Sequence, residues 1–248
     1  MQDPEFDAYA ADYHRQHQDN IRLTGEDPSY FADYKIAQLR RVADSAGMDR
    51  PDILDFGSGI GNSLPGFRRH FPQNPPTCAD VSGASLDLAQ QRFPGDERHV
   101  QIKDRRLPFD DHSFDLVFTA CVFHHIPWDE HSHWLQEMRR VTRPGGKLMV
   151  FEHNPLNPLT VRAVNTCPFD ENARLLSAPA LRDQVAGAGW QDVVTEYHVF
   201  FPAPLAGLRR ADRFLRWCPL GGQHLCLGTA PATDGPPPLA VGPGTARC

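Results

Sequence analysis

An apolar run followed by an acid and three alternate glycines stands out in the stretch ILDFGSGIGNSLPGF, residues 53–67. A buried strand that enters a helix through such glycines can bring its backbone close to a ligand, because glycine adopts positive φ without steric cost. Unpaired amide groups at the turn would suit an anionic or polar ligand. The alternative is a tight turn without a ligand, since short glycine motifs also arise by chance.

Short apolar runs alternate with helical patterns after Pro51, which is typical of a parallel sheet wound with crossover helices. Apolar residues at helical spacing predict helices around residues 64–71, 86–93, 134–141 and 177–190. The expected strands are DILDF (52–56), PTCAD (76–80), HVQIK (99–103), FDLVFTA (114–120), KLMVFEH (147–153), QDVVTEYHVFF (191–201) and GQHLCLGTA (222–230). The pattern predicts an α/β fold.

The chain is expected to divide into three parts. Residues 1–50 have a tyrosine-rich helical pattern without strand signals, and we interpret them as a helical cap. Residues 51–230 hold all the expected strands and form the main domain. Residues 231–248 are rich in proline and glycine with little to bury, which predicts a disordered tail.

The charge and the apolar runs of the chain exclude several classes of protein. The formal net charge is −6, whereas a protein that binds nucleic acid needs a basic surface. No apolar run approaches the roughly 20 residues of a membrane helix. The first ten residues carry acids where a signal peptide would carry basic residues. We therefore expect a cytoplasmic protein with no nucleic-acid partner and no integral membrane segment.

Three residues limit the chemical class of ligand that the glycine loop can bind. A dinucleotide-binding loop would have glycine at position 62, where this chain has Asn62, and the Asp55 carboxylate would repel a pyrophosphate. The same carboxylate would attract an ammonium group, so a zwitterionic ligand without phosphate is favoured. Asp80 stands at the end of the next strand, where an acid can accept both hydroxyls of a ribose. A helix-capping or loop aspartate is the alternative at that position.

Two further stretches, KDRRLPFDDHSFDLVFTACVFHHIP and RVTRPGGKLMVFEHNP, follow in order. With the motifs above, they resemble the class I S-adenosylmethionine-dependent methyltransferases, particularly the broad family that includes ubiquinone/menaquinone-biosynthesis-type enzymes. The resemblance runs from about residue 6 to residue 230. It implies a Rossmann-like, seven-stranded, mostly parallel sheet with flanking helices and an antiparallel last strand. It also implies S-adenosyl-L-methionine as the cofactor.

The resemblance implies roles for individual residues as well. Asp55 and the glycine loop would face the methionine portion, and Asp80 would hold the ribose. Val81 would pack on the adenine, Asp104 would approach the adenine amino group, and the Ala120 carbonyl would accept from the ammonium. The cofactor-binding residues expected on this basis are Asp55, Gly57, Ser58, Gly59, Asn62, Asp80, Val81, Asp104 and Ala120.

The adenine contact departs from the family pattern. The family's acid stands four residues before the leucine of LPF, a position that Lys103 occupies here, while Asp104 stands three residues before it. Two alternatives follow, a loop shifted by one residue or a different adenine contact.

Two histidines follow the fourth expected strand, and another lies at the end of the fifth. Methyl transfer from a sulfonium is an in-line displacement from an activated donor, so positioning can supply much of the catalysis. A hydroxyl or an acidic carbon as acceptor would need a general base, and histidine suits neutral pH. His124, His125 and His153 are the candidate catalytic residues, with structural hydrogen bonding as the alternative role.

Two other clusters of charged or metal-binding residue types carry weaker signals. The histidines between positions 124 and 133 match no established spacing of metal ligands, so no metal is expected. The arginines from Arg209 to Arg216 have helical spacing. They predict either a solvated helix face or contact with an anionic or lipid-like acceptor.

Taken together, these patterns predict a methyltransferase that acts on an oxygen, nitrogen or carbon atom of a small-molecule acceptor. One alternative is a non-methylating protein that retains S-adenosylmethionine or S-adenosylhomocysteine as a structural ligand. The other is a nucleotide-dependent oxidoreductase on a similar sheet, which Asn62 and Asp55 disfavour.

Overall fold

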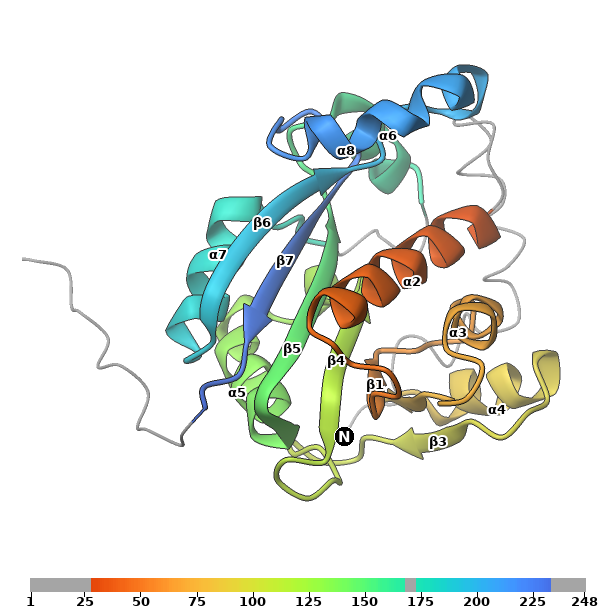
Figure 1. Ribbon diagram of the computed structural model, residues 1–248, viewed down its shortest axis with the longest axis vertical. Helices are drawn as coiled ribbons and strands as arrows, with labels where there is room; N and C mark the ends of the chain where they lie inside the picture. Colours follow the sequence, from red (N-terminus) through yellow and green to blue (C-terminus); the bar gives the residue numbers. More distant parts are fainter. Residues whose placement is uncertain (1–27, 168–172, 233–248) are drawn as a thin grey trace, which may run out of the picture.

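A single mixed sheet forms the centre of the computed structural model, which describes residues 28–167 and 173–232 (Figure 1). Its seven strands have the order β3-β2-β1-β4-β5-β7-β6. They are β1 (Ile53–Phe56), β2 (Thr77–Asp80), β3 (Arg98–Gln101), β4 (Phe114–Ala120), β5 (Thr142–His153), β6 (Gln191–His198) and β7 (Gln223–Thr229). β1 to β5 pair in parallel, and β7 runs antiparallel to β5 and β6. The predicted fold class is confirmed.

The helices begin at residues that suit helix starts. Ser82 caps α4, Asn157 caps α6 and Ser177 caps α7, each through a side-chain oxygen that accepts from a backbone amide. The α-helices are α2 (Pro28–Ser45), α3 (Leu64–His70), α4 (Gly83–Arg92), α5 (His131–Val141), α6 (Pro158–Asn165), α7 (Ala178–Gly187) and α8 (Asp212–Leu215). Short 3₁₀ segments are η3 (Phe123–His125), η4 (Trp128–Glu130) and η6 (Ala203–Ala211).

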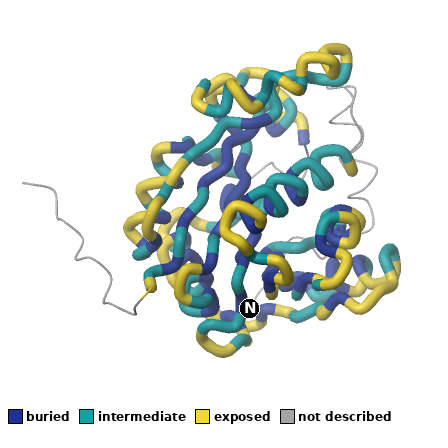
Figure 2. Tube along the Cα trace, viewed as in Figure 1, coloured by how far each residue is buried: buried dark blue, intermediate teal, exposed yellow. Residues whose placement is uncertain are grey.

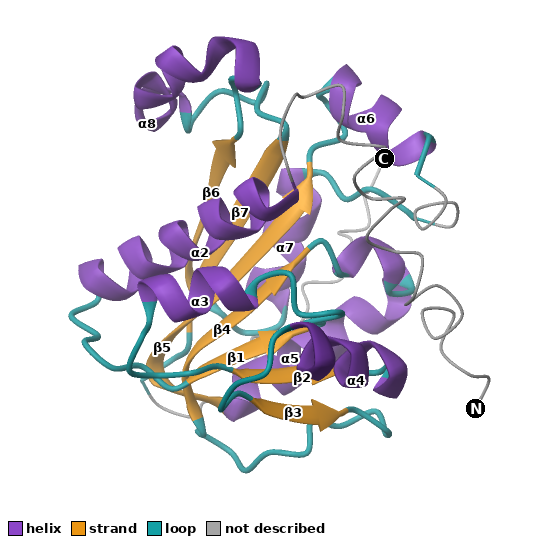
Figure 3. Ribbon diagram, turned by 90° about the vertical axis from the view of Figure 1, so that its right-hand side faces the viewer, coloured by secondary structure: helices purple, strands orange, loops and turns teal. Residues whose placement is uncertain are grey.

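Helices cover both faces of the sheet, because alternate residues along each central strand point to opposite sides. Leu116 and Phe118 of β4 enter a core that also holds α2 and α3, whereas Val117 enters the core that holds α5 and α7. A smaller cluster joins α3, α4 and β2. Figure 3 shows α2, α3 and α4 on one side of the sheet with α5 and α7 behind it, and Figure 2 shows the central strands buried between these layers.

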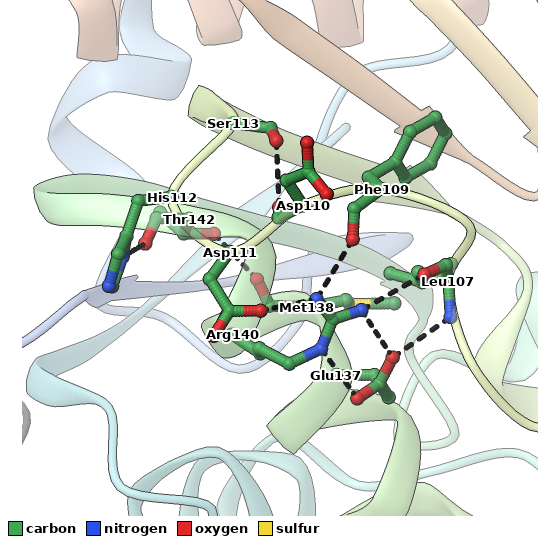
Figure 4. A network of polar contacts seen from close by, with 10 residues as sticks. All are labelled: Leu107, Phe109, Asp110, Asp111, His112, Ser113, Glu137, Met138, Arg140 and Thr142. Carbon is green, nitrogen blue, oxygen red and sulfur yellow. Dashed lines mark hydrogen bonds and ion pairs between the residues drawn. The ribbon is translucent and has the colours of Figure 1, made fainter.

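A guanidinium group fastens the long connection between β3 and β4 onto α5 (Figure 4). Arg140 of α5 donates to the backbone oxygens of Leu107 and Phe109, each at 2.9 Å, and to the Asp111 carboxylate at 2.7 Å. Glu137, one turn earlier, pairs with Arg140 and accepts from the Leu107 amide at 2.9 Å. These charge-assisted bonds fix the end of the segment that carries Asp104.

The predicted three-part division is only partly covered by the described residues. Residues 1–27 of the predicted cap and residues 233–248 of the predicted tail lie outside them. The described remainder of the cap forms α2, whose apolar stripe lies in the same core as β4 and β5. The domain boundary at residue 50 stays a prediction. No helix in the described ranges is both long and apolar enough to cross a bilayer.

Candidate active site

The carboxyl ends of four strands bring most of the predicted site residues to one edge of the sheet. Gly57 follows β1, Asp80 ends β2, Ala120 ends β4 and His153 ends β5, and these strands all run parallel. The strand order reverses at β1, which lies between β2 and β4. Ligands of open α/β sheets bind at such a reversal, outside the carboxyl ends of the strands.

The glycines of the loop serve two different purposes. Gly57 and Gly59 have φ values of 72° and 51°, a backbone region that side chains rarely adopt. A Cβ atom at Gly57 would overlap the side chain of Val122, so this glycine is required for packing. A Cβ atom at Gly59 would meet no heavy atom of the described chain within 4 Å. The backbone at Gly59 is therefore open to a ligand.

The loop amides do not stay unpaired, so that expectation was wrong for the first three of them. The amides of Gly57 and Ser58 donate to the Ala79 oxygen at 2.8 and 3.2 Å. The Gly59 amide donates to Asp80 Oδ2 at 2.8 Å. Because the loop packs against the end of β2, the chain itself uses these donors. A ligand here would be recognised by side chains and by shape.

Asp80 links the glycine loop to the start of α4. Its second oxygen, Oδ1, accepts from the Ser82 amide at 2.9 Å, and the residue is buried. The neighbouring Val81 side chain is 42% exposed and offers an apolar surface beside the carboxylate. The ribose and adenine contacts of these two residues stay predictions.

Asp55 is a buried acid with a strongly altered pKa. Burial, and secondarily the charge of Asp80, raise the pKa of Asp55 to about 8, while the nearby cation of Lys35 opposes the rise. Lys35 lies on α2 and is itself buried. Sequence reasoning missed this lysine, although it stands four residues before the buried Leu39 and hence in the apolar stripe of the helix. A buried cation and a buried acid therefore lie near the glycine loop.

Cys121, directly after β4, forms a polar contact with Lys35. Its φ is 59°, unusual for a residue other than glycine, and its sulfur accepts from Lys35 Nζ at 3.3 Å. Gln223 Nε2 lies 3.8 Å from the same sulfur. Burial alone would raise the pKa of Cys121, but the charges of His153 and Lys35 outweigh it and lower the pKa to about 6. The sequence gave no indication of the Lys35 contact or of the lowered pKa of Cys121, apart from the position of this cysteine after a strand.

Glu152 of β5 is fully buried and holds the loop after β4. Its Oε1 atom accepts from the amides of Val122 and Phe123 at 3.1 and 2.8 Å, and its Oε2 atom lies 2.6 Å from His124 Nδ1. Burial would raise the pKa of Glu152, but the contact with His124 and the nearby histidines hold it well below its usual range. An ionised carboxylate thus orients the His124 ring.

The three candidate catalytic histidines are brought together. The ring of His124 lies 4.1 Å from that of His125 and 5.3 Å from that of His153, measured between centroids. His124 is buried and engaged with Glu152, whereas His125 and His153 are partly exposed. Roles in proton transfer stay predictions for all three.

Two further predicted cofactor-binding residues lie on connecting segments rather than in strands. Asn62 Oδ1 accepts from the Arg92 guanidinium at 2.9 Å, so this side chain connects the loop to α4. Asp104 is exposed on the connection between β3 and β4, and its adenine contact stays a prediction.

A cavity of about 370 Å³ opens near the amino ends of the strands, lined by residues such as Asp52 and Arg98. None of the predicted site residues lines it.

Comparison with known proteins identifies the family. A family model described as a methyltransferase domain matches residues 54–150. The demethylmenaquinone methyltransferase of Deinococcus radiodurans is 30% identical over 168 residues, which cover 65% of this chain and 67% of that protein. The chain belongs to the class I S-adenosylmethionine-dependent methyltransferase family.

Other relatives agree with this family over part of their length. A ubiquinone/menaquinone biosynthesis C-methyltransferase of Hahella chejuensis is 32% identical over 124 residues, covering 47% of this chain and 49% of the relative. The chain thus spans about half the length of the first curated relatives that it matches. A crystal structure of a methyltransferase from Thermotoga maritima superposes with a TM-score of 0.63 and 18% identity, over 91% of this chain and 98% of that one. It has the same fold.

The pKa of Asp55 predicts that cofactor affinity depends on pH. An ammonium group needs the ionised carboxylate, which is the minor form below about pH 8, so binding at pH 6 to 7 should release a proton. Affinity for S-adenosylhomocysteine should rise by up to about tenfold per pH unit toward pH 8. Asp55→Asn should reduce both effects, and the exposed Asp52→Asn serves as a control. Calorimetry in buffers of different ionisation enthalpy measures them, and equal proton release from wild type and Asp55→Asn would contradict the prediction.

Replacing Glu152 tests the buried carboxylate. Glu152→Gln leaves His124 without its anionic partner, so the free energy of unfolding should fall by roughly 3 kcal/mol in urea titrations. The matched control is Asp49→Asn, whose side chain is almost fully exposed and should change stability by less than about 0.5 kcal/mol. A loss below about 1 kcal/mol in Glu152→Gln would show that the pair does not hold the loop.

Proposed function

We propose that the protein transfers the methyl group of S-adenosyl-L-methionine to a small-molecule acceptor at the carboxyl ends of β1, β2, β4 and β5. The observation that carries the proposal is the open backbone at Gly59, flanked by the buried acids Asp55 and Asp80, in a chain of this family. When bound, the cofactor supplies an activated methyl group on a sulfonium. The chain itself needs to bind the cofactor and the acceptor, orient them toward each other, and remove a proton from the acceptor.

Charged side chains at this edge suit a zwitterionic amino acid moiety. Asp55 attracts an ammonium group, and the Lys35 cation is the counterpart for a carboxylate. In this proposal Asp80 would accept from the ribose hydroxyls, and its bonds to the Gly59 and Ser82 amides fix the orientation of its carboxylate. This set fits the methionine and ribose parts of the cofactor.

We propose a quinone-like ring as the acceptor and a ring carbon as the methylated atom. The support is likeness to proteins named as demethylmenaquinone methyltransferases and ubiquinone/menaquinone biosynthesis C-methyltransferases. Carbon methylation of a phenol-like ring requires removal of a proton, for which His153 is the candidate base. Its ring lies beside His124, whose orientation Glu152 fixes.

Cofactor binding and turnover test the proposed activity directly. We expect calorimetry to show one site per chain for S-adenosylmethionine and for S-adenosylhomocysteine. Incubation with a reduced demethylated quinone should then release S-adenosylhomocysteine and a methylated ring, detected by mass spectrometry. Absence of heat for both cofactors would overturn the proposal. Binding without turnover on any quinone, phenol or amine would favour a protein that keeps the cofactor as a structural ligand.

Replacing His153 tests whether catalysis requires removal of a proton from the acceptor or only positioning of the acceptor. If it is the base, His153→Ala should lower the single-turnover methyl-transfer rate by roughly a hundredfold, with cofactor affinity nearly unchanged. If the acceptor is already nucleophilic, the loss should appear mainly in acceptor binding. His99→Ala on the edge strand β3 is the matched control. An unchanged rate and pH profile in folded His153→Ala protein would remove this residue from the mechanism and direct the test to His125.

A further inference from the structure

Exposed apolar side chains gather at one end of the molecule. Seven of the ten large apolar residues that are exposed in the described chain belong to two segments, residues 155–166 and 203–220. The first segment contains α6 and follows β5, and the second contains η6 and α8 and follows β6. The seven residues are Leu156, Leu159, Leu205, Leu208, Phe214, Trp217 and Leu220. We call the two segments together the apical surface.

Hydrogen bonds tie the first segment of the apical surface to the end of the second. Asn157 Nδ2 donates to the Leu220 oxygen at 2.8 Å, and Asn154, directly before the first segment, donates from Nδ2 to the Pro219 oxygen at 2.9 Å. Figures 1 and 3 both show α6 and α8 at the same end of the molecule, beyond the ends of β5 and β6. The exposed side chains therefore belong to one end of the fold rather than to scattered positions.

The apical surface is also basic in a chain that is acidic overall. Its two segments contain five arginines and one acid, Asp212, whereas the whole chain has a formal charge of −6. The apical segments thus carry +4 and the rest of the chain −10. Arg162, Arg210 and Arg213 are exposed. An anionic surface would attract this end and repel the remainder, which favours a single orientation of approach.

Apolar and cationic groups are mixed here in the way that a membrane interface requires. Trp217 is 77% exposed and Leu159 is 69% exposed, a large cost in water that transfer to the headgroup region would remove. Tryptophan is enriched at that depth because its ring is amphipathic. Arginine side chains can lay their apolar stems along the interface and pair with lipid phosphates.

A hollow at the apical surface lies near the candidate active site in the chain. It has a volume of about 480 Å³ and is lined by residues that include Leu156, Val161 and Arg162. Leu156 is three residues after His153, the last residue of β5. A lipid-soluble acceptor leaving a bilayer at this surface would reach the protein at the segment that directly follows β5.

We propose that the apical surface docks the protein reversibly on an anionic lipid bilayer, with Phe214 and Trp217 entering the headgroup region and the exposed Arg162, Arg210 and Arg213 contacting lipid phosphates. Docking itself stands on the exposed apolar residues and the charge distribution. Only the delivery of a lipid-soluble acceptor rests on the proposed methyltransferase function. A protein partner with an acidic, apolar face is the competing occupant, and the test separates the two.

Vesicle sedimentation tests the docking. The full chain should sediment with vesicles of phosphatidylglycerol and phosphatidylcholine at low salt, and at least about tenfold less with pure phosphatidylcholine or at high salt. Phe214→Ser/Trp217→Ser and Arg210→Glu/Arg213→Glu should each weaken binding by about tenfold or more. The matched controls are Trp128→Ser, an exposed tryptophan outside the apical surface, and Arg182→Glu, an exposed arginine on α7.

The outcomes are distinct from those of the activity tests. Circular dichroism and calorimetry with S-adenosylhomocysteine, both without vesicles, establish that each variant is folded and keeps its cofactor site. Equal binding to anionic and neutral vesicles, no binding to either, or equal losses in the control variants would overturn the proposal. No vesicle binding with normal turnover of a water-soluble acceptor would leave the proposed function intact and make a protein the occupant of the apical surface.

Discussion

The candidate active site depends on one buried carboxylate, that of Glu152. It bonds two successive amides of the segment after β4 and the ring of His124, so it connects the end of β5 to the end of β4. Among those amides is that of Val122, whose side chain occupies the space that a Cβ atom at Gly57 would need. The position of the glycine loop is thereby coupled to a carboxylate almost a hundred residues later in the chain. Burial makes this coupling strong, because an unpaired charge in the interior is costly.

The pKa values of the acidic groups at the carboxyl ends of the strands depend on how deeply each group is buried and on the few cations nearby. Lys35 is the cation that contacts Cys121 and acts on Asp55, and it lowers the pKa of both. At Cys121 the nearby cations lower the pKa by more than burial raises it. At Asp55 burial raises the pKa by more than Lys35 lowers it, so the pKa stays high. The pKa values of two groups near Lys35 are therefore shifted in opposite directions, upward for Asp55 and downward for Cys121. A cationic ligand group would reverse the balance at Asp55.

The two ends of the sheet have different surfaces. The carboxyl ends of the strands lead to polar site residues and then to the basic, apolar apical surface. The opposite ends lead to a cavity with aspartates and Arg98, away from the predicted site. This division follows from the parallel strands β1 to β5, which all end at the same edge of the sheet. The segments after β5 and β6 extend that edge, so the proposed binding of an acceptor and the proposed docking on a bilayer would share one end of the molecule.

Local patterns in the sequence determined the strands, their parallel class and the glycine loop, because side-chain periodicity and glycine conformation act over a few residues. They also located the carboxyl ends of β1, β2, β4 and β5, near which Asp55, Asp80 and the histidines lie, whereas β3 and β6 end two and three residues earlier than predicted. Tertiary packing decided what no local pattern encodes. It placed Lys35 of α2 beside Cys121, gave the loop amides protein acceptors, and committed His124 to Glu152. These outcomes depend on which distant groups share a buried space, since desolvation and charge pairing are set by three-dimensional neighbours rather than by position along the chain.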